Sequence, residues 1–302
     1  MSLIRIVTGN AKRHPDKTAI YFADQSLTYS QLIDQVSAIA IGMQKIGVGP
    51  GSHLTVLLNN SVEFAVVMLA AAKLGATIVP MATSLNSDAL DVGIKATDCE
   101  FLIGWHAIVA GHLEAMQTQF PIARDHILVV GGELPGCPSY TKLLTDNSGQ
   151  NSFELADINE DADFILTMTS GSTSAPKPIV FTQATKINRS YAARDMYELT
   201  EDDIILAATP MYHSLAQRLV LLPLLLGATS VIMAGFSPKA WLGAVEKYAV
   251  TFSIAVSSQL EMIVENLKGN ETRLSSLKTI VSSSALLKID IKSKLIEAMN
   301  CD

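Results

Sequence analysis

The sequence is poor in cysteine and has no cysteine arrangement that could build a metal site. Its three cysteines, Cys99, Cys137 and Cys301, lie far apart, and no C-x-x-C pair or zinc-type Cys/His spacing occurs. An odd number of isolated cysteines is typical of reduced thiols in the cytosol. We therefore expect a cytoplasmic protein without a structural metal.

Positive charge is also scarce. The 302 residues include 22 Lys and Arg against 29 Asp and Glu, which gives a net charge of −7. No run of Lys and Arg with interleaved aromatic residues occurs, whereas a nucleic-acid-binding protein normally carries a basic stripe. The composition therefore argues against a nucleic-acid partner.

Long hydrophobic runs are nearly absent. Residues 1–17 contain no extended apolar stretch, so no secretory signal is expected. Residues 219–236 are uncharged for 18 positions, close to the shortest membrane span. Pro223 and Gly227 interrupt this run, and we interpret it as a buried helix followed by a buried strand, with no transmembrane segment.

The chain does contain enough apolar residues for a large core. It is 49% hydrophobic with a mean hydropathy of +0.31, so it is not a disordered segment. Short apolar runs alternate with helical patterns, which is typical of a helix-covered parallel sheet. The predicted strands are 53–59, 76–81, 99–105 and 126–132, with helices at 61–75 (Ser61 as N-cap, Gly75 after its end) and 87–98.

The same helix–strand unit occurs twice. Residues 218–233 repeat the pattern of residues 66–81, and both contain Leu-Gly-Ala-Thr-x-Val. We therefore predict an α/β fold with two similar, mostly parallel sheets, in subdomains of residues 1–185 and 186–302. Strands at 252–256 and 279–284, with a helix at 258–268 between them, are assigned to the second.

The stretch "FILTMTSGSTSAPKPIV" (164–180) places small hydroxyl residues, a glycine and a lysine directly after an apparent buried strand. Hydroxyls, free N–H groups and a cation can surround anionic oxygens, so the loop suits phosphate binding. It is neither G-x-x-x-x-G-K-S/T nor G-x-S-x-G. From composition alone, an ordinary polar surface loop is an equal alternative.

The loop resembles the T-S-G-S/T-T-G-x-P-K-G signature of the adenylate-forming superfamily, which includes acyl- and aryl-CoA synthetases. Ser174 and Pro178 stand where that signature has glycine. The similarity extends along nearly the whole chain. Further matching segments are "LTYSQL" (27–32), 47–81, "TPMYHSL" (209–215) and "SLKTIVSSSALL" (276–287).

The resemblance implies an ATP-dependent ligase that activates a carboxylic acid as acyl-adenylate and passes it to a thiol. ATP, Mg²⁺ and CoA, or a phosphopantetheine carrier protein, would be its cofactors and partners. The residues that match the phosphate-binding positions are Thr169, Ser170, Gly171, Ser172, Thr173 and Lys177.

Two further motifs match the family's substrate pocket. His213 matches a residue beside the acyl pocket, although a hydrogen-bonded capping histidine is the alternative. No aspartate follows it, which favours an acyl or aryl acid over an amino acid. Ser283, Ser284 and Ala285 match G-G-A, where the adenine and acyl pockets meet. The added side-chain atoms favour a small substrate or weak nucleotide binding, and an ordinary strand end is the alternative.

The family's Mg²⁺-binding glutamate and adenylation lysine have no counterpart before Asp302, so the 302 residues contain no assigned catalytic residue. We expect the parent protein to be an acid–thiol ligase and this chain alone to be inactive and to self-associate through uncovered apolar surface. The alternative is a non-catalytic module that binds a ligand or partner.

Overall fold

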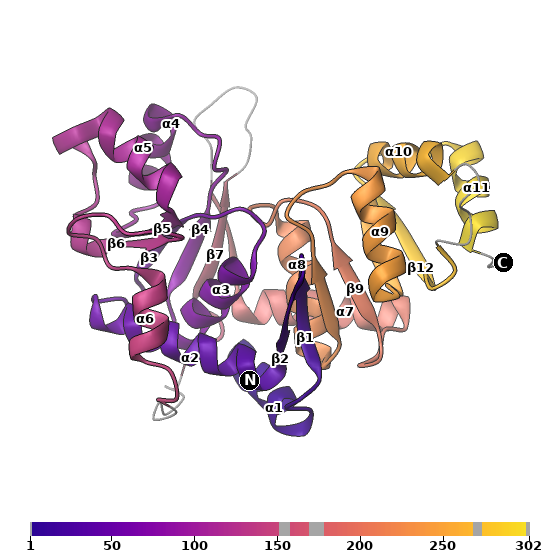
Figure 1. Ribbon diagram of the computed structural model, residues 1–302, viewed down its shortest axis with the longest axis horizontal. Coiled ribbons are helices and arrows are strands. Elements are labelled where there is room, and N and C mark those ends of the chain that lie inside the picture. Colours follow the sequence, from indigo (N-terminus) through magenta and orange to yellow (C-terminus); the bar gives the residue numbers. More distant parts are fainter. Residues whose placement is uncertain (1, 151–157, 169–177, 268–273, 300–302) are drawn as a thin grey trace.

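The computed structural model describes residues 2–150, 158–168, 178–267 and 274–299. Two six-stranded sheets lie side by side, with helices between them and on their outer faces (Figure 1). This arrangement confirms the predicted α/β fold with two similar, mostly parallel sheets.

The first sheet has the strand order β6-β5-β3-β4-β7-β8. Its neighbouring strands are parallel except for β7 and β8, which form an antiparallel hairpin at one edge. Pro178 opens β8, where an edge strand tolerates the missing N–H. The strands are β3 (His53–Leu57), β4 (Thr77–Pro80), β5 (Phe101–Trp105), β6 (Ile127–Val130), β7 (Asp163–Met168) and β8 (Pro178–Thr182).

The second sheet has the order β12-β11-β9-β10-β1-β2. Strand β1 pairs in parallel with β10 through Ile20 and Ser230, and β2 folds back on β1 as the antiparallel edge. The N-terminal hairpin of β1 and β2 thus completes the second sheet, although the sequence analysis assigned residues 1–185 to the first subdomain. The strands are β1 (Thr18–Phe22), β2 (Gln25–Thr28), β9 (Ile204–Ala207), β10 (Thr229–Ile232), β11 (Phe252–Val256) and β12 (Thr279–Ser283).

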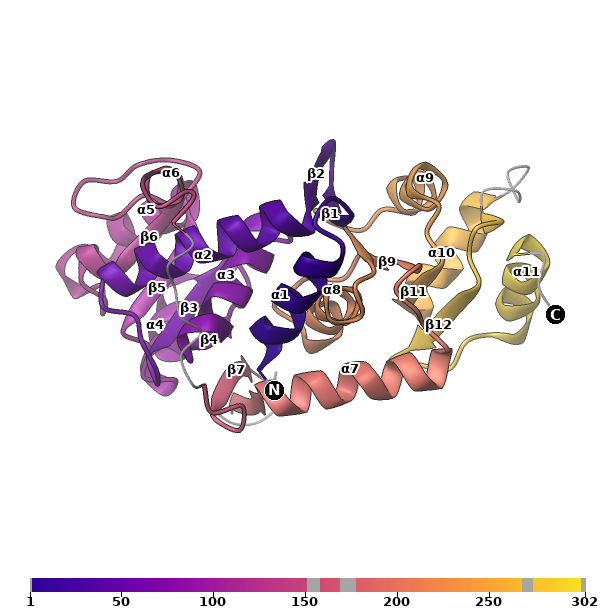
Figure 2. The ribbon, with the colours of Figure 1, turned by 90° about the horizontal axis from the view of Figure 1, so that it is seen from below.

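Helices form three layers around the two sheets (Figure 2). The largest apolar core lies between the sheets and includes α1 (Leu3–Arg13), α2 (Tyr29–Lys45), α3 (Val62–Leu74) and α8 (Ser214–Leu226). Helices α4 (Ser87–Ala96) and α5 (His106–Met116) cover the outer face of the first sheet. The second sheet is covered by α9 (Pro238–Tyr248), α10 (Ser257–Leu267) and α11 (Ile289–Met299).

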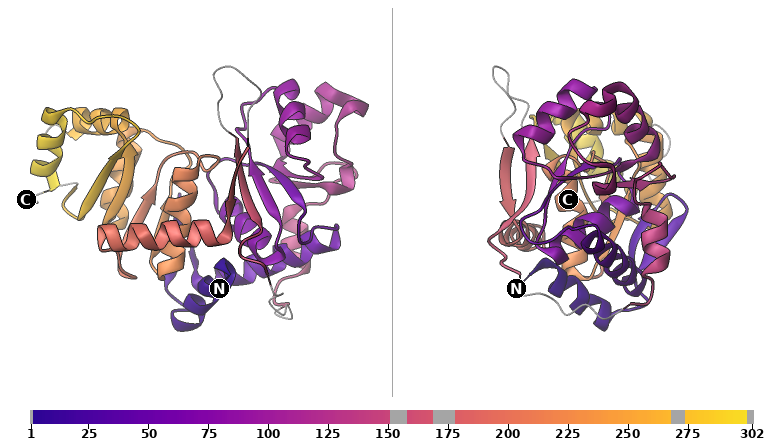
Figure 3. Two further views of the ribbon diagram at one scale, coloured as in Figure 1. Left: turned by 180° about the vertical axis from the view of Figure 1, so that it is seen from behind. Right: turned by 90° about the vertical axis from the view of Figure 1, so that its left-hand side faces the viewer.

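Helix α7 (Gln183–Tyr197) connects the two halves. It follows β8 of the first sheet, packs against α8 and leads into β9 of the second, along one side of the molecule (Figure 3, left). The remaining elements lie on the first half: α6 (Tyr140–Asp146), which packs against α2, and two 3₁₀ turns (Gln117–Gln119 and Arg124–His126).

The repeated helix–strand units share a glycine in the left-handed conformation at the end of the helix. The Ser61 hydroxyl accepts the N–H of Phe64 at the start of α3, and Gly75 and Gly227 end α3 and α8 with φ of +67° and +80°. Residues 219–236 therefore form the end of α8 followed by β10, as predicted. Within the described segments, no helix is long and apolar enough to span a bilayer.

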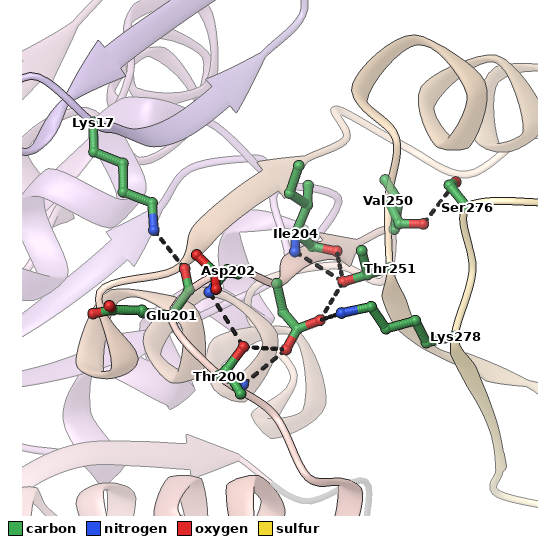
Figure 4. A network of polar contacts seen from close by, with 10 residues as sticks. Lys17, Thr200, Glu201, Asp202, Ile204, Val250, Thr251, Ser276 and Lys278 are labelled. Atoms are coloured by element: carbon green, nitrogen blue, oxygen red, sulfur yellow. Dashed lines mark hydrogen bonds and ion pairs between the residues drawn. The ribbon is translucent and has the colours of Figure 1, made fainter.

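A buried carboxylate fixes the amino ends of three strands of the second sheet. Asp203 precedes β9 and is 3% exposed. Its carboxylate accepts hydrogen bonds from the Thr200 N–H and from the hydroxyl of Thr251 and the ammonium of Lys278, the residues that precede β11 and β12 (Figure 4). These bonds hold the strand starts at the edge opposite the site described next.

Candidate functional site

The carboxyl ends of strands from both sheets meet around one cavity. In open α/β sheets, ligands bind outside the carboxyl ends of the strands. Here the loops after β3, β9 and β10 and the start of α10 enclose a cavity of about 210 Å³. Its lining residues are Asn59, Asn60, Ala208, Pro210, Tyr212, Ala234, Gly235, Phe236 and Gln259.

A larger hollow of about 370 Å³ lies between β12, α10 and α11. Its wall is mainly aliphatic, with Leu260, Leu287 and Leu295, and it is bordered by the amino half of β12. Polar side chains also line it, including Lys278, Ser282 and Lys292, but it lies within the second half of the protein, whereas loops from both sheets meet at the smaller cavity. We therefore place the candidate site in the smaller cavity.

Asn60 joins the two halves of the protein at this cavity. Its side-chain amide donates to the carbonyls of Thr209 (2.8 Å) and Met233 (2.9 Å), and its oxygen accepts the N–H of Met211 (2.6 Å). Asn60 follows β3 of the first sheet, while its partners follow β9 and β10 of the second. The buried side chain of Asn60, which follows a strand of the first sheet, thus fixes the 209–213 loop of the second sheet.

Gln217 on α8 holds the same loop from the other side. Its side-chain N–H donates to the carbonyl of Met211 (3.1 Å), and its oxygen accepts from the ammonium of Lys186 on α7 (2.7 Å). Both Gln217 and Lys186 are buried. A continuous polar chain therefore runs from Asn60 through the loop to α7, and it gives Tyr212 and His213 a fixed support.

Lys186 is the most strongly perturbed cation near this loop. Burial, followed by repulsion from Arg189 and Arg218, lowers its pKa to about 7. The Phe181 ring lies 4.3 Å from the Lys186 nitrogen and supplies a cation–π contact. At neutral pH this lysine is therefore close to the midpoint between its charged and neutral forms.

The replacement Lys186→Met should change how stability depends on pH. Between pH 7 and 10.5 the unfolded chain binds a proton that the folded chain lacks, so the free energy of unfolding of the wild type rises with pH. The slope from this one group is at most about 1.4 kcal/mol per pH unit. Urea unfolding at pH 7 and pH 9 should show that the free energy of unfolding rises less with pH in Lys186→Met than in the wild type. The control Lys142→Met, at an exposed site, should show the same rise as the wild type. Identical pH dependence in all three proteins would contradict the lowered pKa of Lys186.

His213 lies at the N-cap position of α8, beside the cavity but not in its wall. Its ring packs on Tyr212, which does line the cavity, with ring centroids 4.3 Å apart. The side chain makes no capping hydrogen bond to α8, so the capping alternative is not observed. Partial burial lowers the pKa of His213, which favours the neutral imidazole.

Ser283, Ser284 and Ala285 lie at the carboxyl end of β12, on the same edge of the sheet as the cavity. They are outside its wall, and Ser284 and Ala285 are exposed. Ser284 has a φ of +73°, a conformation that normally favours glycine. The serine thus adopts a backbone conformation that is strained for a residue with a side chain.

The predicted phosphate-binding residues Thr169, Ser170, Gly171, Ser172, Thr173 and Lys177 lie outside the described residues. The two strands that flank them are described. Strand β7 runs parallel to β4 and ends at Met168, and β8 begins at Pro178 and returns antiparallel. The end of β7 and the start of β8 thus lie at the same edge of the first sheet as the loop after β3.

The AMP-binding enzyme family model matches residues 7–302. The chain belongs to this family. Among curated relatives, it is 28% identical over 290 residues to an indoleacetate–CoA ligase of Aromatoleum aromaticum, covering 95% of this chain and 56% of that protein. A feruloyl-CoA synthase of an Amycolatopsis species is also 28% identical, over 95% of this chain and 55% of that protein. The chain spans just over half the length of these relatives.

Solved structures of CoA ligases show the same fold. A long-chain-fatty-acid-CoA ligase from Archaeoglobus fulgidus superimposes with a TM-score of 0.89 at 23% identity, over all of this chain and 61% of that one. The anthranilate CoA ligase AuaEII, solved with anthranoyl-AMP, gives a TM-score of 0.91 at 21% identity, over all of this chain and 58% of that one. These similarities show that the chain has the fold of the matching part of these ligases.

The sequence analysis missed Asn60, Gln217 and Lys186. The only local signal for Asn60 was its position between a predicted strand and the N-cap Ser61. Gln217 and Lys186 lie inside helical patterns and carry no motif. The hydrogen-bond partners of these three residues lie up to 173 positions away along the chain, so sequence spacing alone could not reveal the contacts.

Proposed function

We propose that this chain is the N-terminal part of an ATP-dependent acid–thiol ligase. A carboxylate would attack the α-phosphate of ATP and expel pyrophosphate, and a thiol of CoA or a carrier protein would then accept the acyl group from the adenylate. The observation that carries the proposal is the cavity at the junction of both sheets, bordered by a loop that Asn60 and Gln217 hold from two sides.

We assign part of the ATP site to described residues. Ser284 has a positive φ just after the carboxyl end of β12, and by their match to the family signature we assign Ser283, Ser284 and Ala285 to the border of the adenine and acyl pockets. Thr169 to Thr173 and Lys177 would hold the phosphates. The described part of the chain contains no group of three His, Cys, Asp or Glu able to hold a metal ion. Mg²⁺, when bound, neutralises phosphate charge, and we assign no step to it.

In this proposal the protein mainly positions the acid. Tyr212 and Phe236 give the cavity apolar walls that exclude water, while Asn60 and Gln259 supply polar groups. His213, whose lowered pKa favours the neutral imidazole, lies next to Tyr212 and would border the path of the acyl group. Because the 209–213 loop is fixed before the substrate arrives, little ordering would remain for the bound state.

The replacement Lys177→Ala should weaken ATP binding to the 302-residue chain about tenfold or more, because a charge-assisted contact to phosphate is lost. Isothermal titration calorimetry measures this directly. The matched control is Lys142→Ala, which removes an exposed lysine on α6. Equal affinities of wild type and Lys177→Ala would count against the phosphate-binding role.

The reaction itself is tested with the full-length product of the gene that encodes these residues. It should show exchange of labelled pyrophosphate into ATP that depends on an added carboxylic acid. The 302-residue chain alone should show none. Absence of acid-dependent exchange in the full-length product would favour the non-catalytic binding module instead.

A further inference from the structure

Three cations gather where α7 packs against the first turn of α8. Lys186 and Arg189 come from α7 and Arg218 from α8, and together they surround a narrow crevice beside Ser214. The Lys186 ammonium and the Arg189 guanidinium each lie 3.4 Å from the Ser214 hydroxyl. Both cations also lie over the ring of Phe181, at 4.3 and 5.3 Å from its centroid.

No acidic side chain in the described part of the chain pairs with this cluster. The charges that act on Lys186 are those of Arg189 and Arg218, and both lower its pKa. The Nε of Arg218 is buried and has no hydrogen-bond partner among the described residues. Burying like charges together without an anion is unfavourable. A ligand that brings negative charge would remove this penalty.

The cluster adjoins the loop that borders the candidate acid site. Ser214 directly follows His213, and Gln217 bridges Lys186 to Met211 within that loop. The crevice itself is too narrow for a water molecule, whereas Arg189 is exposed at its mouth. An anionic group would therefore bind at the mouth, on the guanidinium of Arg189 and beside Ser214.

We propose that the acid activated by this protein carries a second carboxylate, which Arg189 binds with support from Lys186 and Arg218. This inference rests on the proposed ligase function and names the class of its substrate, a dicarboxylic acid. One carboxylate would be activated near the cavity, and the other would be held at the cation cluster. The arriving charge would raise the pKa of Lys186, so binding at neutral pH would take up a proton.

Acid-dependent pyrophosphate exchange by the full-length gene product tests the inference with matched acids. The pairs are octanoate with octanedioate and phenylacetate with 4-carboxyphenylacetate. We expect kcat/KM to favour the dicarboxylate of at least one pair about tenfold. The variant Arg189→Leu should reduce this ratio about tenfold, whereas Arg194→Leu, which removes an exposed arginine of the same helix, should leave it unchanged.

Calorimetry in buffers of different ionisation enthalpy gives an independent readout. Binding of the preferred dicarboxylate at pH 7 should take up protons in the wild type and not in Lys186→Met. Exchange that is equally fast with monocarboxylates, at a ratio insensitive to Arg189→Leu, would overturn the inference but leave the ligase function intact. An Arg189→Leu variant with an unchanged exchange ratio but a raised KM for CoA in the complete thioester-forming reaction would also overturn it, because the cluster would then bind a phosphate of the thiol substrate. No exchange with any acid would overturn both.

Discussion

Replacing Asp203 by alanine is expected to lower the free energy of unfolding by about 3 kcal/mol. The Asp203 carboxylate is buried and links Thr200, Thr251 and Lys278 at the amino ends of three strands (Figure 4). Burial alone would raise its pKa, but the hydrogen bonds from these residues outweigh burial and leave the pKa below its ordinary value. The folded state therefore favours the ionised carboxylate.

The pH dependence of this effect follows from the direction of the pKa shift. A carboxyl group whose pKa is lowered on folding stabilises the protein above the unfolded-state pKa, near 4, and loses that contribution as the pH falls. The difference between wild type and Asp203→Ala should thus be largest at neutral pH and shrink below about pH 4. Urea unfolding at several pH values measures it, with the exposed neighbour Asp202→Ala as control. An Asp202→Ala effect as large as that of Asp203→Ala would contradict the network.

The local parts of the fold were accessible from sequence because their signals are short-range. Ser61, Gly75 and Gly227 mark helix ends through contacts within one turn, and the strands of 252–256 and 279–284 are short apolar runs. The place of β1 in the second sheet was not accessible. Ile20 pairs with Ser230, and nothing in the first 30 residues indicates a partner 210 positions away.

Some parts of the candidate site could likewise be predicted from the sequence, and others could not. The 209–213 loop and the 283–285 strand end were found by resemblance, and the structure places both at the carboxyl edge of the second sheet. Their roles in binding remain predictions. The support of the loop by Asn60 depends on side-chain hydrogen bonds between two sheets, which no periodicity or motif encodes. Composition showed that the chain is acidic overall, yet it gave no sign that three cations cluster at α7 and α8.

Asn60→Ala should have the largest effect on the site. It leaves the carbonyls of Thr209 and Met233 and the N–H of Met211 without their partner in a buried place, and each lost partner costs about 1–1.5 kcal/mol or more. We expect the free energy of unfolding to fall by about 3–5 kcal/mol. Because the 209–213 loop loses one of its two supports, kcat/KM for the acid in the proposed reaction of the full-length protein should fall by at least about tenfold.

Two further variants separate the loss of the Asn60 hydrogen bonds from a general effect of changing the loop after β3. Asn59→Ala alters the exposed neighbour, whose side chain accepts a hydrogen bond from the Thr83 hydroxyl and from no other described residue, and should change stability by less than about 0.5 kcal/mol. Asn60→Asp keeps the size and the acceptor for Met211 but turns both donations to carbonyls into repulsions, so it should be as damaging as alanine. If Asn60→Asp had the same free energy of unfolding as the wild type at pH 7, the hydrogen bonds to Thr209 and Met233 would not be what joins the two sheets. The proposed positioning of the acid depends on a fixed 209–213 loop, and other contacts would then have to fix it.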